Sequence, residues 1–219
     1  MDPLLSSFLF GIFLIALLLF LYLYGGDTRF ANVGTLQSAE RLDYDLTTYL
    51  RREGKGTKSR KRYIFSEEPL VSMTYRYNGR FDSIVVKWVE GPILDAVIER
   101  KFPRSYLPDK PVIEDVFQAS LYALALKEKG LSISSTIIVT IYCLQDEAER
   151  CLRKNSIQCI GCSKGAIFTE RFNEKKSVKA LEKLDEIWYR GRSPAPKPSE
   201  RSCRICPYGK DGICNFSAV

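Results

Sequence analysis

The segment from residue 62 to residue 102 limits the possible folds most, because its apolar residues recur with a period of two. Its runs of valine, isoleucine, tyrosine and phenylalanine predict strands over 62–65, 70–77, 82–89 and 93–102. Two further strands are predicted over 134–144 and 166–172, and helices over 36–52, 109–128 and 177–189. Strands and helices in this order predict an α/β fold with a mixed central β-sheet flanked by helices.

The N-terminal segment is apolar on every side. Residues 8–24 carry no charge, and a helix over residues 3–24 could cross the hydrocarbon core of a membrane, roughly 30 Å thick. A cleaved signal peptide is less favoured because Asp2 is the one charged residue before the stretch, with no lysine or arginine, and a buried core helix is less favoured because the segment is apolar on every face. Basic residues follow the stretch, so the sequence predicts a single-pass anchor with the remainder in the cytoplasm. Three parts are expected: 1–26, the anchor; 27–192, the α/β domain; and 193–219, a cysteine-rich metal-binding tail.

Composition excludes several kinds of chemistry. The chain has no histidine, which rules out Ser-His-Asp triads, Cys-His nucleophiles and His-ligated zinc. Its 33 lysines and arginines against 26 acidic residues give a formal charge of +7, which favours nucleic acid or a lipid surface as partner. The basic run over residues 51–62 is either a solvated loop or a contact for phosphate or lipid headgroups.

The strands on either side of Glu90-Gly91 bring charged residues together. A two-residue hairpin loop there would place Val89 opposite Pro92, Val86 opposite Asp95, and Asp82 opposite Glu99. Lys101 would share the face of Glu99, because side chains two apart on a strand point the same way. Two close carboxylates favour a bound divalent cation, and oxygen ligands suit Mg²⁺ or Mn²⁺. The alternative is a ladder of surface ion pairs along the hairpin.

Three short motifs follow one another along the chain. They read Gly79-Arg80-Phe81-Asp82, then Ile98-Glu99-Arg100-Lys101, then Gln118-Ala119-Ser120-Leu121-Tyr122. Together they resemble the PD-(D/E)XK nucleases of the RecB-like branch. The cysteine-rich tail narrows this resemblance to the CRISPR-associated exonucleases that carry an iron–sulfur cluster, and the resemblance covers residues 79–214.

The resemblance implies a restriction-endonuclease-like core and a role for each motif residue. Asp82 and Glu99 would bind the metal, and Lys101 would be catalytic. The residues expected to support the site and contact nucleic acid are Gln118, Tyr122, Arg80 and Arg100. The family usually supplies a further histidine ligand upstream, and here Glu53, Glu67 or Glu68 would have to replace it.

The seven cysteines would face a reducing compartment, which favours metal ligands or buried thiols over disulfides. The tail contributes Cys203, Cys206 and Cys214 at a spacing typical of metal ligands. A fourth ligand is expected from the segment 143–162, with Cys159 and Cys162 preferred. A [4Fe–4S] cluster, Zn²⁺, and disulfides or free thiols remain open for this set.

These features predict a Mg²⁺- or Mn²⁺-dependent DNA exonuclease that acts on single-stranded ends. The resemblance implies a role in CRISPR spacer acquisition or DNA repair, with CRISPR adaptation proteins as partners. The alternative is a catalytically impaired nuclease fold that binds DNA while tethered to the membrane. A membrane-anchored structural protein whose basic loop binds lipid is a third interpretation.

Overall fold

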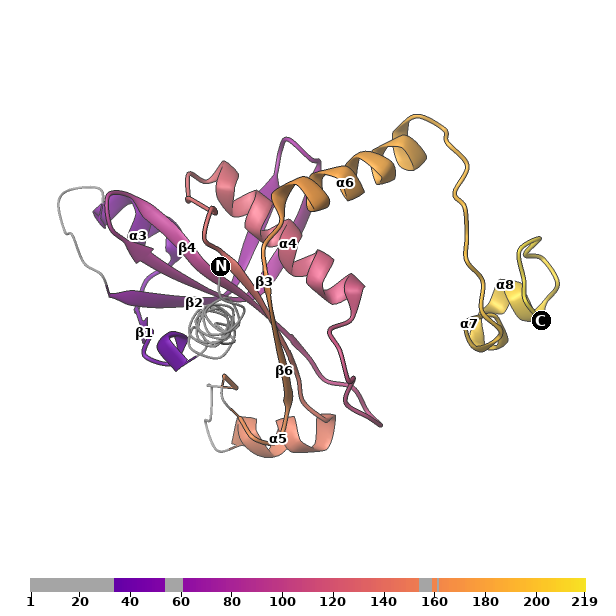
Figure 1. Cartoon of the computed structure of the whole chain (residues 1–219), viewed down its shortest axis with the longest axis horizontal. Coiled ribbons are helices and arrows are strands. Elements are labelled where there is room, and N and C mark those ends of the chain that lie inside the picture. Colours follow the sequence, from indigo (N-terminus) through magenta and orange to yellow (C-terminus); the bar gives the residue numbers. More distant parts are fainter. Residues whose placement is uncertain (1–33, 54–60, 154–158, 161) are drawn as a thin grey trace, which may run out of the picture. The chain divides into compact units, whose positions relative to one another are not determined.

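A mixed β-sheet forms the centre of the fold. The structure, a computed structural model, describes residues 34–53, 61–153, 159–160 and 162–219. The sheet has the strand order β1-β2-β3-β4-β5-β6, in which β1–β2 and β4–β5 are parallel and the other neighbours antiparallel (Figure 1). The strands are β1 (Glu40–Arg41), β2 (Arg62–Ser72), β3 (Tyr77–Trp88), β4 (Pro92–Lys101), β5 (Ile137–Tyr142) and β6 (Ala166–Arg171). An α/β class with a mixed sheet is therefore confirmed.

Six helices have both of their ends within the described residues: α3 (Leu46–Glu53), α4 (Ile113–Glu128), α5 (Gln145–Arg153), α6 (Glu174–Tyr189), α7 (Glu200–Ile205) and α8 (Pro207–Lys210). The single helix predicted over residues 36–52 is wrong, because β1 interrupts it. Asp45 restarts the helix, since its Oδ1 accepts a hydrogen bond from the Thr48 backbone at 2.7 Å. The regular spacing of apolar residues comes from two separate segments. Leu36 packs in the smaller apolar cluster and Leu46 packs in the larger one.

The turn between β2 and β3 replaces the strand predicted over residues 70–77. β2 ends at Ser72 and β3 begins at Tyr77, so the predicted strand is wrong over the residues between them. The Glu128 carboxylate at the end of α4 accepts hydrogen bonds from the Ser72 hydroxyl and from the Met73 backbone. These contacts satisfy backbone groups that a sheet would otherwise pair.

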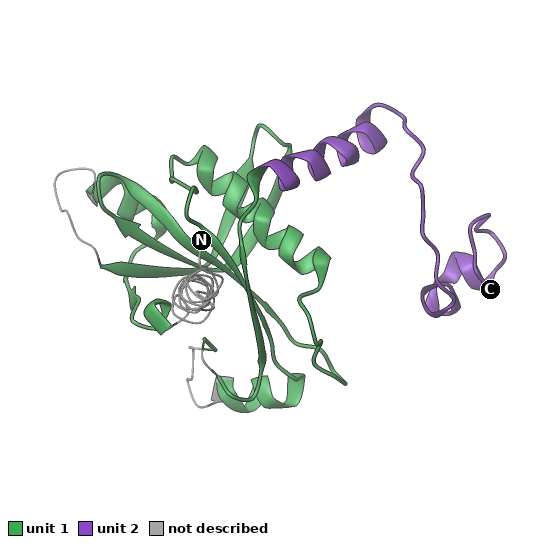
Figure 2. Cartoon of the chain, viewed as in Figure 1, with its two compact units in different colours: residues 1–174 green, residues 175–219 purple. Residues whose placement is uncertain are grey.

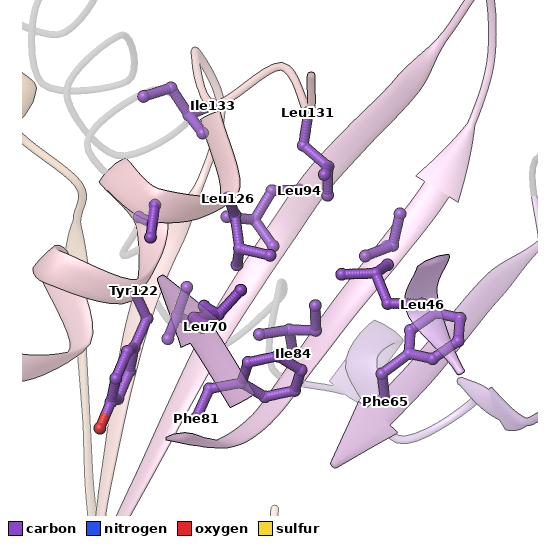
Figure 3. Packing of buried hydrophobic residues seen from close by; sticks show 14 of the residues in the cluster. Leu46, Phe65, Leu70, Phe81, Ile84, Leu94, Tyr122, Leu126, Leu131 and Ile133 are labelled. Carbon is purple, nitrogen blue, oxygen red and sulfur yellow. The ribbon is translucent and has the colours of Figure 1, made fainter. Parts of the chain in front are cut away.

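Helix α4 packs on the sheet through the larger apolar cluster, which includes Phe81, Ile84 and Leu126 (Figure 3). The helix ends at Glu128, and two residues later Gly130 adopts a φ of 92° that suits glycine, while the Leu131 N–H donates a hydrogen bond to the Leu126 carbonyl. Both leucines are buried, so the helix end is closed by backbone pairing and an apolar contact together. This closure fixes α4 between β4 and β5, the parallel pair that it connects.

The chain divides into two compact units, residues 1–174 and 175–219 (Figure 2). The first, unit 1, holds all six strands. The second, unit 2, holds most of α6 together with α7, α8 and the three tail cysteines. The sequence-based boundary at residues 192/193 lies beyond α6, whereas the units meet at its start.

The predicted single-pass anchor, and with it the membrane location, must be corrected. Among the helices in the described part of the chain, none is long and apolar enough to cross a membrane. The segment that suggested the anchor, residues 1–26, lies outside the described residues. The fold is therefore an α/β architecture without a spanning helix in any described element.

Candidate active site

The register of the β3–β4 hairpin decides which charged side chains meet. Trp88 pairs with Pro92 and Val86 with Leu94, so the predicted pairings of Val89 with Pro92 and of Val86 with Asp95 are wrong. The loop is longer by one residue than the predicted two-residue loop. Further along, however, Ser83 pairs with Ile98, which is the predicted register again.

A β-bulge at Asp95 restores that register. Val85 pairs with Ala96 and Val86 with Leu94, which leaves Asp95 as the additional residue of β4. The Asp95 carboxylate is buried and bonded to Arg62 at 2.7 Å and to Lys87 at 2.5 Å. The longer loop and the bulge cancel, so Asp82 and Glu99 are the next residues beyond the Ser83–Ile98 pair.

Asp82 is held against β4 by its own side chain. Its Oδ2 accepts a hydrogen bond from the backbone N–H of Arg100 at 2.7 Å. The negative charge of Asp82 also raises the pKa of Glu99. The charge of Asp82 therefore acts on the Glu99 carboxylate, the other member of the predicted metal pair.

Glu99 is the most deeply buried acidic group of the site, with 1% of its surface exposed. Its Oε1 lies 2.7 Å from Lys101 Nζ, whereas its buried Oε2 has no hydrogen-bond partner. Burial raises the pKa of Glu99, and the charges of Asp82 and Asp115 raise it further against the opposing effect of Lys101. A carboxylate oxygen that is buried and unpartnered is costly unless a cation or a proton satisfies it.

Lys101 lies at the centre of the polar contacts. Besides its ion pair with Glu99, its ammonium donates a hydrogen bond to Gln118 Oε1 at 2.9 Å. Burial tends to lower the pKa of Lys101, but the contact with Glu99 and the charges of Glu99, Asp115 and Asp82 raise it above its usual value. Lys101 is therefore held as a cation.

Gln118 and Tyr122 continue this network along α4. Gln118 Nε2 donates to the Tyr122 hydroxyl at 2.9 Å, as expected for residues four apart on one helix face. Figure 3 shows the Tyr122 ring at the border of the apolar cluster, with its hydroxyl pointing away from it. A Cβ at Gly79 would lie 3.0 Å from the Tyr122 ring, so the glycine of the first motif makes room for the tyrosine of the third.

The structure does not bring every predicted residue to this network. Arg100 pairs with Glu67 at 3.0 Å through its Nη2, and its Nε is buried. Arg80 is exposed on β3. Glu68 accepts hydrogen bonds from the Leu46 backbone at 3.1 and 3.2 Å, and the Glu53 side chain lies outside the described part of the chain. Neither Glu67 nor Glu68 therefore takes the place of the missing histidine.

Two site residues were missed. Asp115 Oδ1 lies 3.6 Å from Lys101 Nζ, and Asp115 Oδ2 accepts a hydrogen bond from the Tyr142 hydroxyl at 2.8 Å. The spacing of three between Asp115 and Gln118 places both on one helix face and could have indicated Asp115. Nothing in the sequence indicates Tyr142, because it reaches the site through the pairing of β5 with β4.

The two carboxylates of the site suit a hard cation that takes few of its ligands from the protein. No three cysteine, aspartate or glutamate side chains gather closely enough to hold a metal ion within the described ranges. Mg²⁺, however, usually keeps several waters and binds through one or two carboxylates. The residues that would hold it are Asp82 and Glu99, through the free oxygen of the latter.

The cysteines form two sets. Cys143, Cys151, Cys159 and Cys162 belong to unit 1, where burial raises the pKa of the Cys143 thiol and the other three thiols add to this effect. Cys203, Cys206 and Cys214 belong to unit 2. Cys203 is buried there, and its sulfur accepts a hydrogen bond from the Ala218 backbone at 3.4 Å.

Comparison with known proteins adds no relative. The sequence matches no protein-family model and no curated protein. The side chains that indicate a function are therefore those of the polar network described above: Asp82, Glu99, Lys101, Gln118 and Tyr122.

Proposed function

We propose that this chain is a Mg²⁺- or Mn²⁺-dependent nuclease that hydrolyses phosphodiester bonds of DNA at single-stranded ends. The observation that carries the proposal is the Glu99 carboxylate, which is buried beside Asp82 with one oxygen on Lys101 and the other unpartnered. An arrangement that is costly without a cation becomes favourable with one. Both motif carboxylates of the nuclease resemblance contribute to it.

When bound, the divalent cation would supply Lewis-acid stabilisation of charge on the phosphoryl oxygens. Lys101 contributes a second positive charge, fixed by Glu99 and Gln118, for the negative charge that develops in the transition state. Because its pKa is raised, Lys101 orients and neutralises rather than accepting a proton. The Tyr122 hydroxyl and the exposed Arg80 are available to hold the DNA strand.

A second function, DNA binding without hydrolysis, is favoured by one observation. No third ligand side chain joins Asp82 and Glu99 among the residues described, and the usual histidine is absent from the sequence. The excess of lysine and arginine would still attract DNA, with an affinity that falls steeply as salt is raised.

The test uses the full chain and labelled single-stranded DNA, either linear or circular, with Mn²⁺, Mg²⁺ or EDTA. The proposal predicts loss of linear DNA only with a divalent cation, and a roughly hundredfold or greater loss of rate in Asp82→Asn. Glu170→Gln, which neutralises an exposed carboxylate on β6, serves as the matched control. A fully active Asp82→Asn variant refutes the assignment, and DNA binding without cleavage by the wild type supports the second function.

The tail is proposed to hold a [4Fe–4S] cluster, or Zn²⁺, through Cys203, Cys206 and Cys214 of unit 2. Support comes from the donor set itself and from the N–H donated to Cys203 Sγ, a contact that stabilises a thiolate. Elemental analysis and the visible spectrum of the full chain test this.

We expect Cys203→Ser to lose the metal, and Cys151→Ser to retain it. The assignment is wrong if Cys203→Ser, Cys206→Ser and Cys214→Ser all keep full metal content.

A further inference from the structure

A chain of polar contacts connects the first turn of α4 to β5 and β4. The Tyr142 hydroxyl accepts a hydrogen bond from the Val112 N–H at 3.0 Å and donates one to Asp115 Oδ2 at 2.8 Å. Tyr142 is the last residue of β5 and pairs in register with Lys101 on β4. Burial raises the pKa of Tyr142 to about 12, so its hydroxyl keeps its proton and remains a donor. One oxygen of Asp115 is thereby fixed.

The other oxygen of Asp115 faces the Lys101 ammonium at 3.6 Å. Lys101 Nζ also lies 2.7 Å from Glu99 Oε1 and 2.9 Å from Gln118 Oε1. An ammonium has three N–H donors and no acceptor, and here two of them are directed at the oxygens of Glu99 and Gln118. At 3.6 Å the contact with Asp115 is a charge interaction rather than a short hydrogen bond.

We propose that Asp115 is a positioning residue of the site, fixed by Tyr142, which holds the Lys101 ammonium in place beside the Asp82–Glu99 pair. The inference rests on the proposed nuclease function for its catalytic consequence. A cation bound to Glu99 would share the negative charge of that carboxylate with Lys101. Lys101 therefore needs a second anionic partner to stay in place. Asp115 supplies that partner from α4, whereas Gln118 supplies a neutral one.

The test compares Asp115→Asn, Tyr142→Phe and the double variant in the full chain. Glu114→Gln is the matched control, because Glu114 is exposed in the same first turn and carries the same charge near the helix N-terminus. We expect Asp115→Asn to lower kcat about tenfold to hundredfold, with KM for DNA and the midpoint of Mn²⁺ activation changed less than about twofold. Tyr142→Phe should lower kcat less, and should add nothing in the Asp115→Asn background, because it acts through Asp115.

A readout independent of cleavage separates failure of this inference from failure of the proposed function. In ¹⁵N-lysine-labelled protein kept in EDTA, the protons of the Lys101 ammonium, assigned with Lys101→Arg, should exchange with water severalfold faster in Asp115→Asn than in wild type or Glu114→Gln. This result supports the positioning role even if the wild type cleaves no DNA.

Three outcomes overturn the inference. The first is unchanged Lys101 exchange in Asp115→Asn. The second is weakened Mn²⁺ activation in that variant, which would make Asp115 a ligand. The third is an equal loss of kcat in Glu114→Gln, which would assign the effect to the helix terminus.

Discussion

Neutralising Glu99 should stabilise the protein in the absence of metal while abolishing its response to metal. In Glu99→Gln the buried, unpartnered oxygen no longer carries a charge, which removes a penalty of about 1–3 kcal/mol. The ion pair with Lys101 is lost, but that ammonium is about a third exposed and can still donate to the amide oxygen, so this costs about 0.5–1 kcal/mol. The net gain is about 1 kcal/mol, or roughly 2–4 °C in Tm for a chain of this size.

The sign of the effect depends on pH. Because the folded-state pKa of Glu99 is raised, the folded protein binds this proton more tightly than the unfolded chain does. The wild type therefore loses stability as pH rises from about 4.3, the usual value for glutamate, through the raised folded value. The advantage of Glu99→Gln should grow as pH rises through the raised folded-state pKa of Glu99 and should vanish below about pH 4.

Thermal denaturation in EDTA and in Mn²⁺ measures both parts. Mn²⁺ at a hundred times its Kd should stabilise the wild type by about 2.7 kcal/mol and leave Glu99→Gln unchanged. Glu170→Gln should behave as wild type in both conditions. The reasoning fails if Glu99→Gln is less stable than wild type in EDTA at neutral pH, or if Mn²⁺ stabilises it equally.

Three further predictions concern the surroundings of the site. Gly79→Ala should lower the rate of DNA cleavage roughly tenfold with little change in Tm, because the new Cβ displaces the Tyr122 ring. An unchanged rate would show that the position of the ring does not matter for cleavage. Asp95→Ala should destabilise the fold by about 2 kcal/mol in urea denaturation, since it leaves Arg62 and Lys87 without their shared carboxylate; a smaller loss than in Arg62→Ala would contradict this. Burial tends to raise the pKa of Glu128, but hydrogen bonds from Ser72, Thr74 and Met73 outweigh it and lower that pKa. Glu128→Gln should therefore cost up to about 1 kcal/mol at pH 7 and nothing below the folded-state pKa of Glu128, as measured by denaturation across pH.

The sequence was informative wherever the structure depends on local pattern. Alternation predicted the long strands, and the spacing of four predicted that Gln118 and Tyr122 would meet. The placement of Asp82 beside Glu99 was obtained from a hairpin loop one residue too short. The register recovered only because the bulge at Asp95 compensates, and a bulge depends on pairing with β3 rather than on the residues of β4 alone.

The remaining features depend on contacts between distant segments. β1 replaced part of a predicted helix because Glu40 and Arg41 pair with Tyr63 and Ile64. The stabilisation from this pairing depends on a distant segment, so local propensity does not reveal it. Tyr142 reached the site through the parallel pairing of β5 with β4. Likewise, the sequence did not indicate that Arg100 on β4 pairs with Glu67 on β2.

The bulge at Asp95 also separates two parts of the β3–β4 hairpin. The number of residues near the turn can differ by one without changing the strand pairing near Asp82 and Glu99. Leu94 and Ala96 belong to different apolar clusters, as consecutive residues of an unbulged strand would. Deleting residue 95 would therefore join two stretches of β4 that already have their partners and their faces. Loss of this one residue would leave Glu99 in its place relative to Asp82. In alignments of future relatives, a gap between the turn and the Glu-x-Lys motif should fall at this position.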